Sequence, residues 1–301
     1  MGKRKRYLLL LSVCLCAVLC GTQVQAKVKK GKWKSNIRWT YDTKTKELVF
    51  TGKGDMESCE LDSEESASNM PGWSHFEEDV QKIVVKEGIT SVAPYLGEFY
   101  NLKSLELPDS VRVIGMQAFT RTKKLKKVKL PSGLKEIGID AFEDSGLTEV
   151  NIPSGVKKVK DFAFSGNFRL EKVTVQEGVE VLGFCSFSCC ENLRKLTLPN
   201  SLKKFEYGCF MGMLSLEKVT IPENVEQIGD AVFCTSDRKV QLRKVVIRSK
   251  KIKKWGKGIF KGARKGLVIE VPASKKKEYS KALKKKKLPS CVKVVGKKNL
   301  D

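Results

Sequence analysis

Apolar side chains recur along the chain in one pattern that repeats every 22 or 23 residues. Each unit opens with a leucine, has further apolar residues three and five positions later, and in most cases continues into a proline. Self-similarity with a period of about 20 to 30 residues predicts a solenoid, in which every unit forms one coil and stacks on its neighbours. The opening leucines are Leu102, Leu125, Leu147, Leu170, Leu193 and Leu216.

The apolar positions at the start of a unit alternate with polar ones. Val173 and Val175, for example, flank Thr174 and follow Lys172. Alternation with a period of two predicts a short strand with one buried face. The proline that follows lacks a backbone donor and therefore ends the strand. We expect each unit to supply one short strand and a turn.

The second part of a unit holds an apolar–glycine pair, such as Ile114-Gly115, and closes on a small residue and an aromatic one, such as Ala118-Phe119. Glycine at this position serves either a positive backbone φ or a close approach between coils. Stacked phenylalanines at the closing position are expected to form one wall of the core. These residues are Phe119, Phe142, Phe164, Phe187 and Phe210, and Phe233 is expected to stack one residue late.

The ends of the chain differ from the repeats. Residues 1–26 have the pattern of a secretory signal peptide, with a basic start, an apolar stretch and a Val24-Gln25-Ala26 cleavage site. A lipid anchor at Cys20 is disfavoured by the bulky Leu19 before it. Cleavage after Ala26 leaves an N-terminal cap region at 27–79, a solenoid of about eight coils at 80–271 and a Lys-rich C-terminal cap at 272–301. No later segment has the roughly 18 apolar residues of a membrane span. We therefore expect a secreted protein, or one held at the cell surface by noncovalent contacts.

The chain is strongly basic, with 58 Lys and Arg against 34 Asp and Glu and a net charge of +24, of which +20 follows the predicted leader. Such a charge attracts anionic polymers through a salt-screened interaction of low specificity. Acidic glycans and wall polymers match an exported location better than nucleic acid does. We expect no nucleic-acid partner.

The proline after the strand, the Ile-Gly pair and the closing Ala-Phe make the repeat resemble the BspA-type bacterial leucine-rich repeat over residues 80 to about 271. Segments 37–56 and Pro71-Gly72-Trp73 resemble that family's N-terminal hairpin cap, and the segment from Val271 to Leu283 resembles its C-terminal cap. The resemblance implies a mainly β repeat solenoid with short turns or helical pieces, and an adhesion-like role as a non-catalytic interaction scaffold. Residues 216–241 carry three extra residues, which predicts a bulged loop near Thr235 to Val240.

Outward-facing strand positions of consecutive coils are expected to lie in rows about 5 Å apart along one sheet. Four consecutive lysines occupy one row, and three threonines occupy the next. This basic stripe is either a docking strip for an acidic protein, glycan or polymer, or a solvated face that keeps the sheet soluble. If the lysines instead hold an envelope polymer, the protein has a structural, envelope-associated role. The candidate ligand-binding residues are Lys172, Lys195, Lys218 and Lys244, with Thr174, Thr197 and Thr220.

Candidate chemistry is sparse. Seven cysteines follow the predicted leader, an odd number without the spacing of a disulfide framework or a zinc site. We expect their thiols to pack in the core, and a bridge between Cys185 and Cys209 is left open. The one histidine, His75, is near Cys59 and Asp79 in sequence, but no motif relates these residues as a thiol hydrolase requires. We therefore expect no enzymatic activity, no metal and no cofactor.

Overall fold

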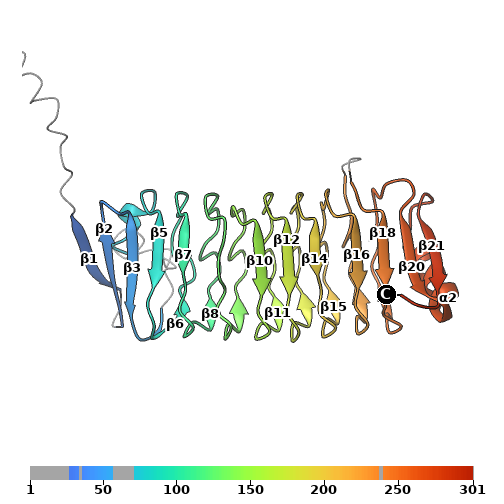
Figure 1. The fold of residues 1–301 in the computed structure, drawn as a ribbon, viewed down its shortest axis with the longest axis horizontal. Coiled ribbons are helices and arrows are strands. Elements are labelled where there is room, and N and C mark those ends of the chain that lie inside the picture. The colour runs from blue at the N-terminus through green and yellow to red at the C-terminus, as the bar shows by residue number, and fades with distance from the viewer. Residues whose placement is uncertain (1–26, 34–35, 57–70, 237–239, 301) are drawn as a thin grey trace, which may run out of the picture.

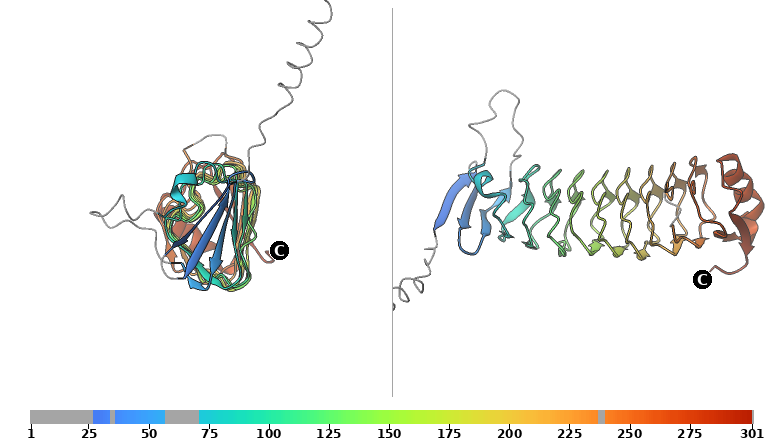
Figure 2. Two further views of the ribbon diagram at one scale, coloured as in Figure 1. Left: turned by 90° about the vertical axis from the view of Figure 1, so that its left-hand side faces the viewer. Right: turned by 90° about the horizontal axis from the view of Figure 1, so that it is seen from above.

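The repeat units stack into a straight rod, with the N-terminal cap at one end and the C-terminal cap at the other (Figures 1 and 2). The computed structural model describes residues 27–33, 36–56, 71–236 and 240–300. The predicted leader at 1–26, Cys59 and part of the loop expected at 235–240 lie outside these described residues. The predicted β solenoid with a cap at each end is confirmed.

One face of the rod carries the strands that begin each unit, and we call it the long-strand face. Neighbouring strands pair in parallel and in register, so that Val150 lies beside Val173 of the next coil. The apolar side chains of these strands point into the core, as the alternation predicts. The strands of this face are β3 (Glu47–Gly52), β5 (Lys82–Val85), β7 (Ser104–Glu106), β10 (Glu149–Ile152), β12 (Lys172–Val175), β14 (Lys195–Thr197), β16 (Lys218–Ile221), β18 (Lys244–Ile247) and β20 (Val268–Pro272).

A second set of strands, mostly of two residues, forms the short-strand face of the rod. Each one precedes the glycine position of its unit, so the prediction of one strand per unit was wrong. The apolar residue of the apolar–glycine pair is the last residue of a second strand. That strand is too short to show a period of its own in the sequence. These strands are β4 (Gly54–Asp55), β6 (Ile89–Val92), β8 (Val113–Ile114), β9 (Glu136–Ile137), β11 (Lys158–Val159), β13 (Val181–Leu182), β15 (Lys204–Phe205), β17 (Gln227–Ile228) and β19 (Lys254–Trp255).

A continuous ladder of phenylalanine rings forms one wall of the core, as predicted. Successive ring centroids are 5.2–5.8 Å apart, and all of the rings are buried. Phe233 was expected one residue late, but it stacks in phase between Phe210 and Phe260. The ladder consists of Phe119, Phe142, Phe164, Phe187, Phe210, Phe233 and Phe260.

The glycines after the short strands serve close approach between coils. A Cβ added at Gly115 would lie 2.3 Å from the Pro94 nitrogen, and one at Gly138 would lie 2.5 Å from the Met116 nitrogen. The positive φ falls two residues later, mostly at residues with side chains. Those residues are Tyr95, Gln117, Asp140, Phe162, Cys185, Gly208, Ala231 and Gly258.

The caps close both ends of the core. At the N-terminus, β1 (Val28–Trp33) and β2 (Ile37–Asp42) extend β3 as antiparallel strands, and the 3-10 helix η1 (Ser74–Phe76) follows Trp73. The buried Trp73 ring contacts Trp33, Trp39 and Phe50 edge-on. At the C-terminus, η2 (Ala273–Lys275) leads into α2 (Lys276–Lys285), and β21 (Lys293–Lys297) pairs with β20. Helix α2 buries Tyr279 and Leu283 and so closes the C-terminal end of the core.

Candidate ligand-binding surface

The predicted basic stripe lies on the outside of the long-strand face, but it is divided into two pairs. Lys172 is in register beside Lys195, and Lys218 is in register beside Lys244. Strands β14 and β16 belong to separate sheets, so the strand pairing that aligns each pair stops between them. Adjacent paired strands lie about 4.8 Å apart, which keeps the two lysines of each pair close.

The four lysines differ in their acidic neighbours. Lys244 forms an ion pair with Glu270 at 3.0 Å. Among the described residues, no carboxylate lies within ion-pair distance of Lys172, Lys195 or Lys218. These three side chains are exposed, so their charge is available to a ligand.

The threonine row follows the same division. Thr174 and Thr220 are half-buried, and Thr197 is exposed. Val246 occupies the next position of the row on β18 and is only 1% exposed. The chain after β21 returns across this part of the face, where Arg248 Nε donates to the Leu300 carbonyl oxygen at 2.8 Å (Figure 1). The row of threonines therefore ends at Thr220 on β16.

A groove opens on the long-strand face where one coil forms no strand. Residues 127–130 have the alternating pattern of their neighbours, yet they lie unpaired between β7 and β10 (Figure 1). This coil runs from Leu125 to Gly146 and is one residue shorter than the others of the regular array. Gly146 passes so close to the preceding coil that an added Cβ would lie 2.2 Å from the Lys123 carbonyl oxygen.

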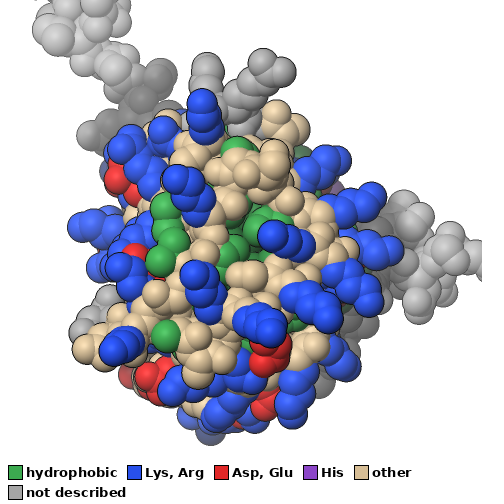
Figure 3. Space-filling view, turned by 90° about the vertical axis from the view of Figure 1, so that its right-hand side faces the viewer, with side chains coloured by type: hydrophobic (Ala, Val, Ile, Leu, Met, Phe, Trp, Pro, Cys, Tyr) green, Lys and Arg blue, Asp and Glu red, His purple; other side chains and the backbone are tan. Residues whose placement is uncertain are grey.

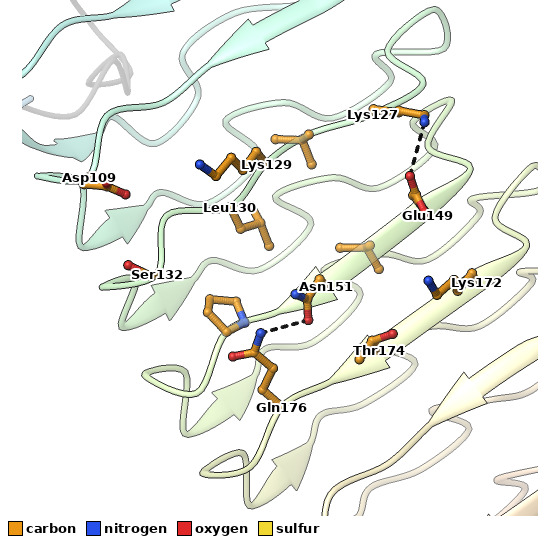
Figure 4. Close-up of a pocket in the computed structure, with 13 residues that line it drawn as sticks. Asp109, Lys127, Lys129, Leu130, Ser132, Glu149, Asn151, Lys172, Thr174 and Gln176 are labelled. Atoms are coloured by element: carbon orange, nitrogen blue, oxygen red, sulfur yellow. Dashed lines mark hydrogen bonds and ion pairs between the residues drawn. The ribbon is translucent and has the colours of Figure 1, made fainter.

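The groove has a volume of about 760 Å³ and combines basic, amide and hydroxyl groups over an apolar floor. Lys129, Asn151 and Thr174 come from three successive coils and lie along it (Figure 4). Val128, Leu130, Val150 and Pro153 supply the apolar surface, while Lys127, Lys172, Ser132, Gln176, Asp109 and Glu149 complete the lining.

Two contacts fix the polar groups of this groove. Lys127 Nζ lies 3.3 Å from a Glu149 carboxylate oxygen, so its charge is compensated. Gln176 Nε2 donates to Asn151 Oδ1 at 3.2 Å, which leaves the N–H groups of Asn151 free to donate to a ligand (Figure 4). Lys129 and Lys172 have no ion-pair partner among the described residues. Asp109 at the edge of the lining also has no ion-pair partner among the described residues. The other uncompensated groups are cations and donors, which match carboxylate, sulfate or phosphate oxygens.

An exposed apolar ridge on the turns after the short strands was missed by the sequence analysis. Ile139, Phe184 and Tyr207 are 38%, 37% and 42% exposed. The Phe184 ring stacks on the Tyr207 ring with a centroid distance of 4.8 Å, and its centroid lies 5.2 Å from that of Phe162. The signal was available, because Ile139 and Phe184 each follow the apolar–glycine pair and Tyr207 has the same phase. This ridge can contact apolar parts of a ligand or partner.

The described cysteines are free thiols, and Cys185 and Cys209 are not joined. Burial raises the pKa of Cys185 and Cys189, and it raises the pKa of Cys190 and Cys209 further. These thiols are therefore protonated at neutral pH and poor nucleophiles. Cys190 Sγ donates to the Phe164 carbonyl oxygen at 3.3 Å, the same oxygen that accepts from the Asn167 side chain. The thiol thus helps to satisfy buried backbone groups.

The single histidine, His75, lines a shallow pocket together with Glu77, Asp79 and Glu98. His75 is exposed on η1, where its ring contacts Phe76. Asp79 forms an ion pair with Lys46 at 3.3 Å. Among the described residues, no group of three or more His, Cys, Asp or Glu side chains could hold a metal ion.

The family model of the BspA type leucine rich repeat region matches residues 47–170, 90–212 and 157–289, with six copies. These overlapping matches cover most of the chain, and the coils they span are those described above. The chain belongs to the BspA-type leucine-rich repeat family. No curated protein matches the chain.

Two solved structures of bacterial leucine-rich repeat proteins match the chain. The chain is 20% identical to a leucine-rich repeat protein from Bacteroides ovatus over 87% of this chain and 76% of that one, with a TM-score of 0.54. It is 20% identical to a leucine-rich repeat protein from Eubacterium ventriosum over 82% and 78% of the two chains, with a TM-score of 0.45. The likeness to the first structure shows that this BspA-type chain shares the solenoid architecture.

No helix of the described structure lies over the long-strand face of the BspA-type coils, and the chain near Leu300 crosses this face at β18 (Figures 1 and 2). Within the described ranges, the protein contains no helix with the length and apolar character needed to cross a membrane.

Proposed function

We propose that the protein is an exported, non-catalytic scaffold of adhesion-like function that holds an extended acidic ligand across its long-strand face. The groove at residues 127–130 is the observation that carries this proposal, because it combines uncompensated lysines with free amide and hydroxyl donors. A ligand in this groove contacts successive coils, so an extended acidic glycan or protein segment fits better than a compact small molecule.

The stripe and the groove share Lys172 and Thr174, and the stripe continues from there to Lys195 and Thr197. We assign the ligand to this part of the face. Lys218, Lys244 and Thr220 form a separate extension beyond the break in the sheet. The signal-peptide pattern of residues 1–26, which lie outside the described structure, supports export.

A binding measurement on paired lysine variants tests this assignment. The probes are hyaluronan, heparin and poly-glutamate, each titrated at about 0.15 M salt, where weak surface attraction is largely screened. Lys129→Gln with Lys172→Gln should weaken binding of the tightest probe about tenfold, since two uncompensated charges are removed. The variant with Lys218→Gln and Lys244→Gln tests whether the ligand extends beyond the break between β14 and β16, because its binding weakens only if the ligand reaches these lysines.

The matched control is Lys44→Gln with Lys53→Gln, which removes two exposed charges from the N-terminal cap. This control should bind as the parent protein does. Equal weakening by the groove pair and the control pair would show that only net charge matters, and the groove would then lose its assignment.

A further inference from the structure

The net positive charge of the chain is concentrated at one end of the rod. Residues 71–240, which contain most of the coils, hold 23 Lys and Arg and 23 Asp and Glu, so they are neutral overall. Residues 241–301 hold 22 Lys and Arg against 3 Asp and Glu, a net charge of +19 out of +24. The rod is therefore strongly polarised along its axis.

The C-terminal cap presents this charge on the end of the rod. Residues 272–300 contain eleven lysines, no arginine and one carboxylate, Glu278. Figure 3 shows Lys and Arg side chains distributed all around this end, with few carboxylates among them. Nine of the lysines are exposed: Lys276, Lys277, Lys281, Lys284, Lys285, Lys287, Lys293, Lys297 and Lys298.

The nine exposed lysines of the cap are not used to hold it in place. Helix α2 is anchored by Tyr279, whose ring meets Trp255 and whose hydroxyl donates to the Ser249 carbonyl oxygen at 3.1 Å. Glu278 is paired with Lys275 at 2.7 Å, and Glu270 beneath the cap is paired with Lys244. No carboxylate of the described residues compensates the nine exposed lysines. Like charges at this density repel one another unless an anion binds them.

We propose that the C-terminal cap docks the rod end-on to a bilayer of anionic phospholipid. The lysines surround the end of the rod instead of following one groove, so they match an extended surface better than a single polymer chain. They are point charges without arginine forks, which suits the mobile phosphate headgroups of a bilayer. End-on docking leaves the long-strand face free for its own ligand, and this inference does not depend on the groove.

Vesicle co-sedimentation tests the proposal. Vesicles of phosphatidylglycerol and phosphatidylcholine, mixed in equal amounts, should bind the full chain lacking residues 1–26 at low salt and release it at about 0.5 M salt. A variant with five cap lysines changed together to Gln should weaken vesicle binding at least about 100-fold. These lysines are Lys276, Lys277, Lys281, Lys284 and Lys285. The Lys129→Gln, Lys172→Gln variant should bind the same vesicles normally, which separates this surface from the groove.

The control removes the same number of charges from the opposite end, by changing the exposed Lys27, Lys30, Lys32, Lys44 and Lys53 together to Gln. Binding that falls only in the cap variant supports the proposal. Equal loss in both variants, or equal binding to vesicles of phosphatidylcholine alone, would overturn it. Cap-dependent binding to soluble polyphosphate without binding to vesicles would also overturn it, because the partner would then be a phosphate polymer.

Discussion

The phenylalanine ladder gives single residues a large share of the stability of the coils. Phe187 is fully buried between Phe164 and Phe210, whose ring centroids lie 5.2 and 5.7 Å from its own. Phe187→Ala should lower the free energy of unfolding by about 3–5 kcal/mol, because it removes buried apolar surface and leaves a cavity. Denaturant titration measures this change. Phe168→Ala is the control, since Phe168 is 49% exposed and its loss should cost about 0.5 kcal/mol or less.

The residue pattern predicts side-chain burial better than it predicts backbone conformation. The fixed spacing identifies the ladder because burial follows directly from periodicity. The positive φ was invisible to the same reasoning, since it falls on residues such as Gln117, Phe162 and Cys185. Those residues have a left-handed backbone because the coil must turn there, and tertiary contacts between coils impose it against their own preference.

At the scale of elements, the repeat pattern predicts a long-face strand in each of the six units that begin at Leu102 to Leu216, including one strand that does not form. Residues 127–130 alternate like their neighbours, so local pattern gave no indication of a gap. The informative signal was the length of the coil, which is one residue shorter and closes at Gly146. Strand pairing depends on the relative placement of two coils, and no single unit contains that information. The stripe of four lysines was accordingly predicted as continuous, and its division was not.

One buried hydroxyl contributes to the attachment of the cap helix, beside the packing of Tyr279 and Leu283, and its contribution can be tested. Tyr279 donates to the Ser249 carbonyl oxygen and accepts from the Ile252 amide at 3.2 Å. Tyr279→Phe should cost about 1–3 kcal/mol, because both backbone groups lose a partner in a buried site. Hydrogen exchange should show the loss as faster exchange in α2. Tyr207→Phe changes an exposed hydroxyl and should leave both the exchange and the stability unaltered.

The whole molecule separates two electrostatic regimes along one axis. The coils from 71 to 240 balance their charges through ion pairs between neighbouring coils, such as Lys203 with Glu180 at 2.8 Å. The C-terminal end has almost no carboxylates for such pairing. A repeat protein can separate the two regimes because each coil contacts only its neighbours, so one end can be specialised without disturbing the others.

Acid should therefore destabilise the coils before it affects the cap. Burial alone would raise the pKa of Glu206, but hydrogen bonds from Lys204 and Lys158 outweigh burial and hold this pKa below its usual value. The pKa of Glu180 is also lowered, chiefly by its hydrogen bond with Lys203. A carboxyl whose pKa is lower in the folded state adds stability above its unfolded pKa of about 4.3 and loses that stability as the pH falls through the folded value.

The melting temperature of the protein should therefore fall steadily below about pH 4.5. In Glu206→Gln it should be lower by on the order of 2–4 °C at pH 7, with a smaller further decline in acid. A variant that keeps the full decline would show that other carboxylates carry the acid sensitivity.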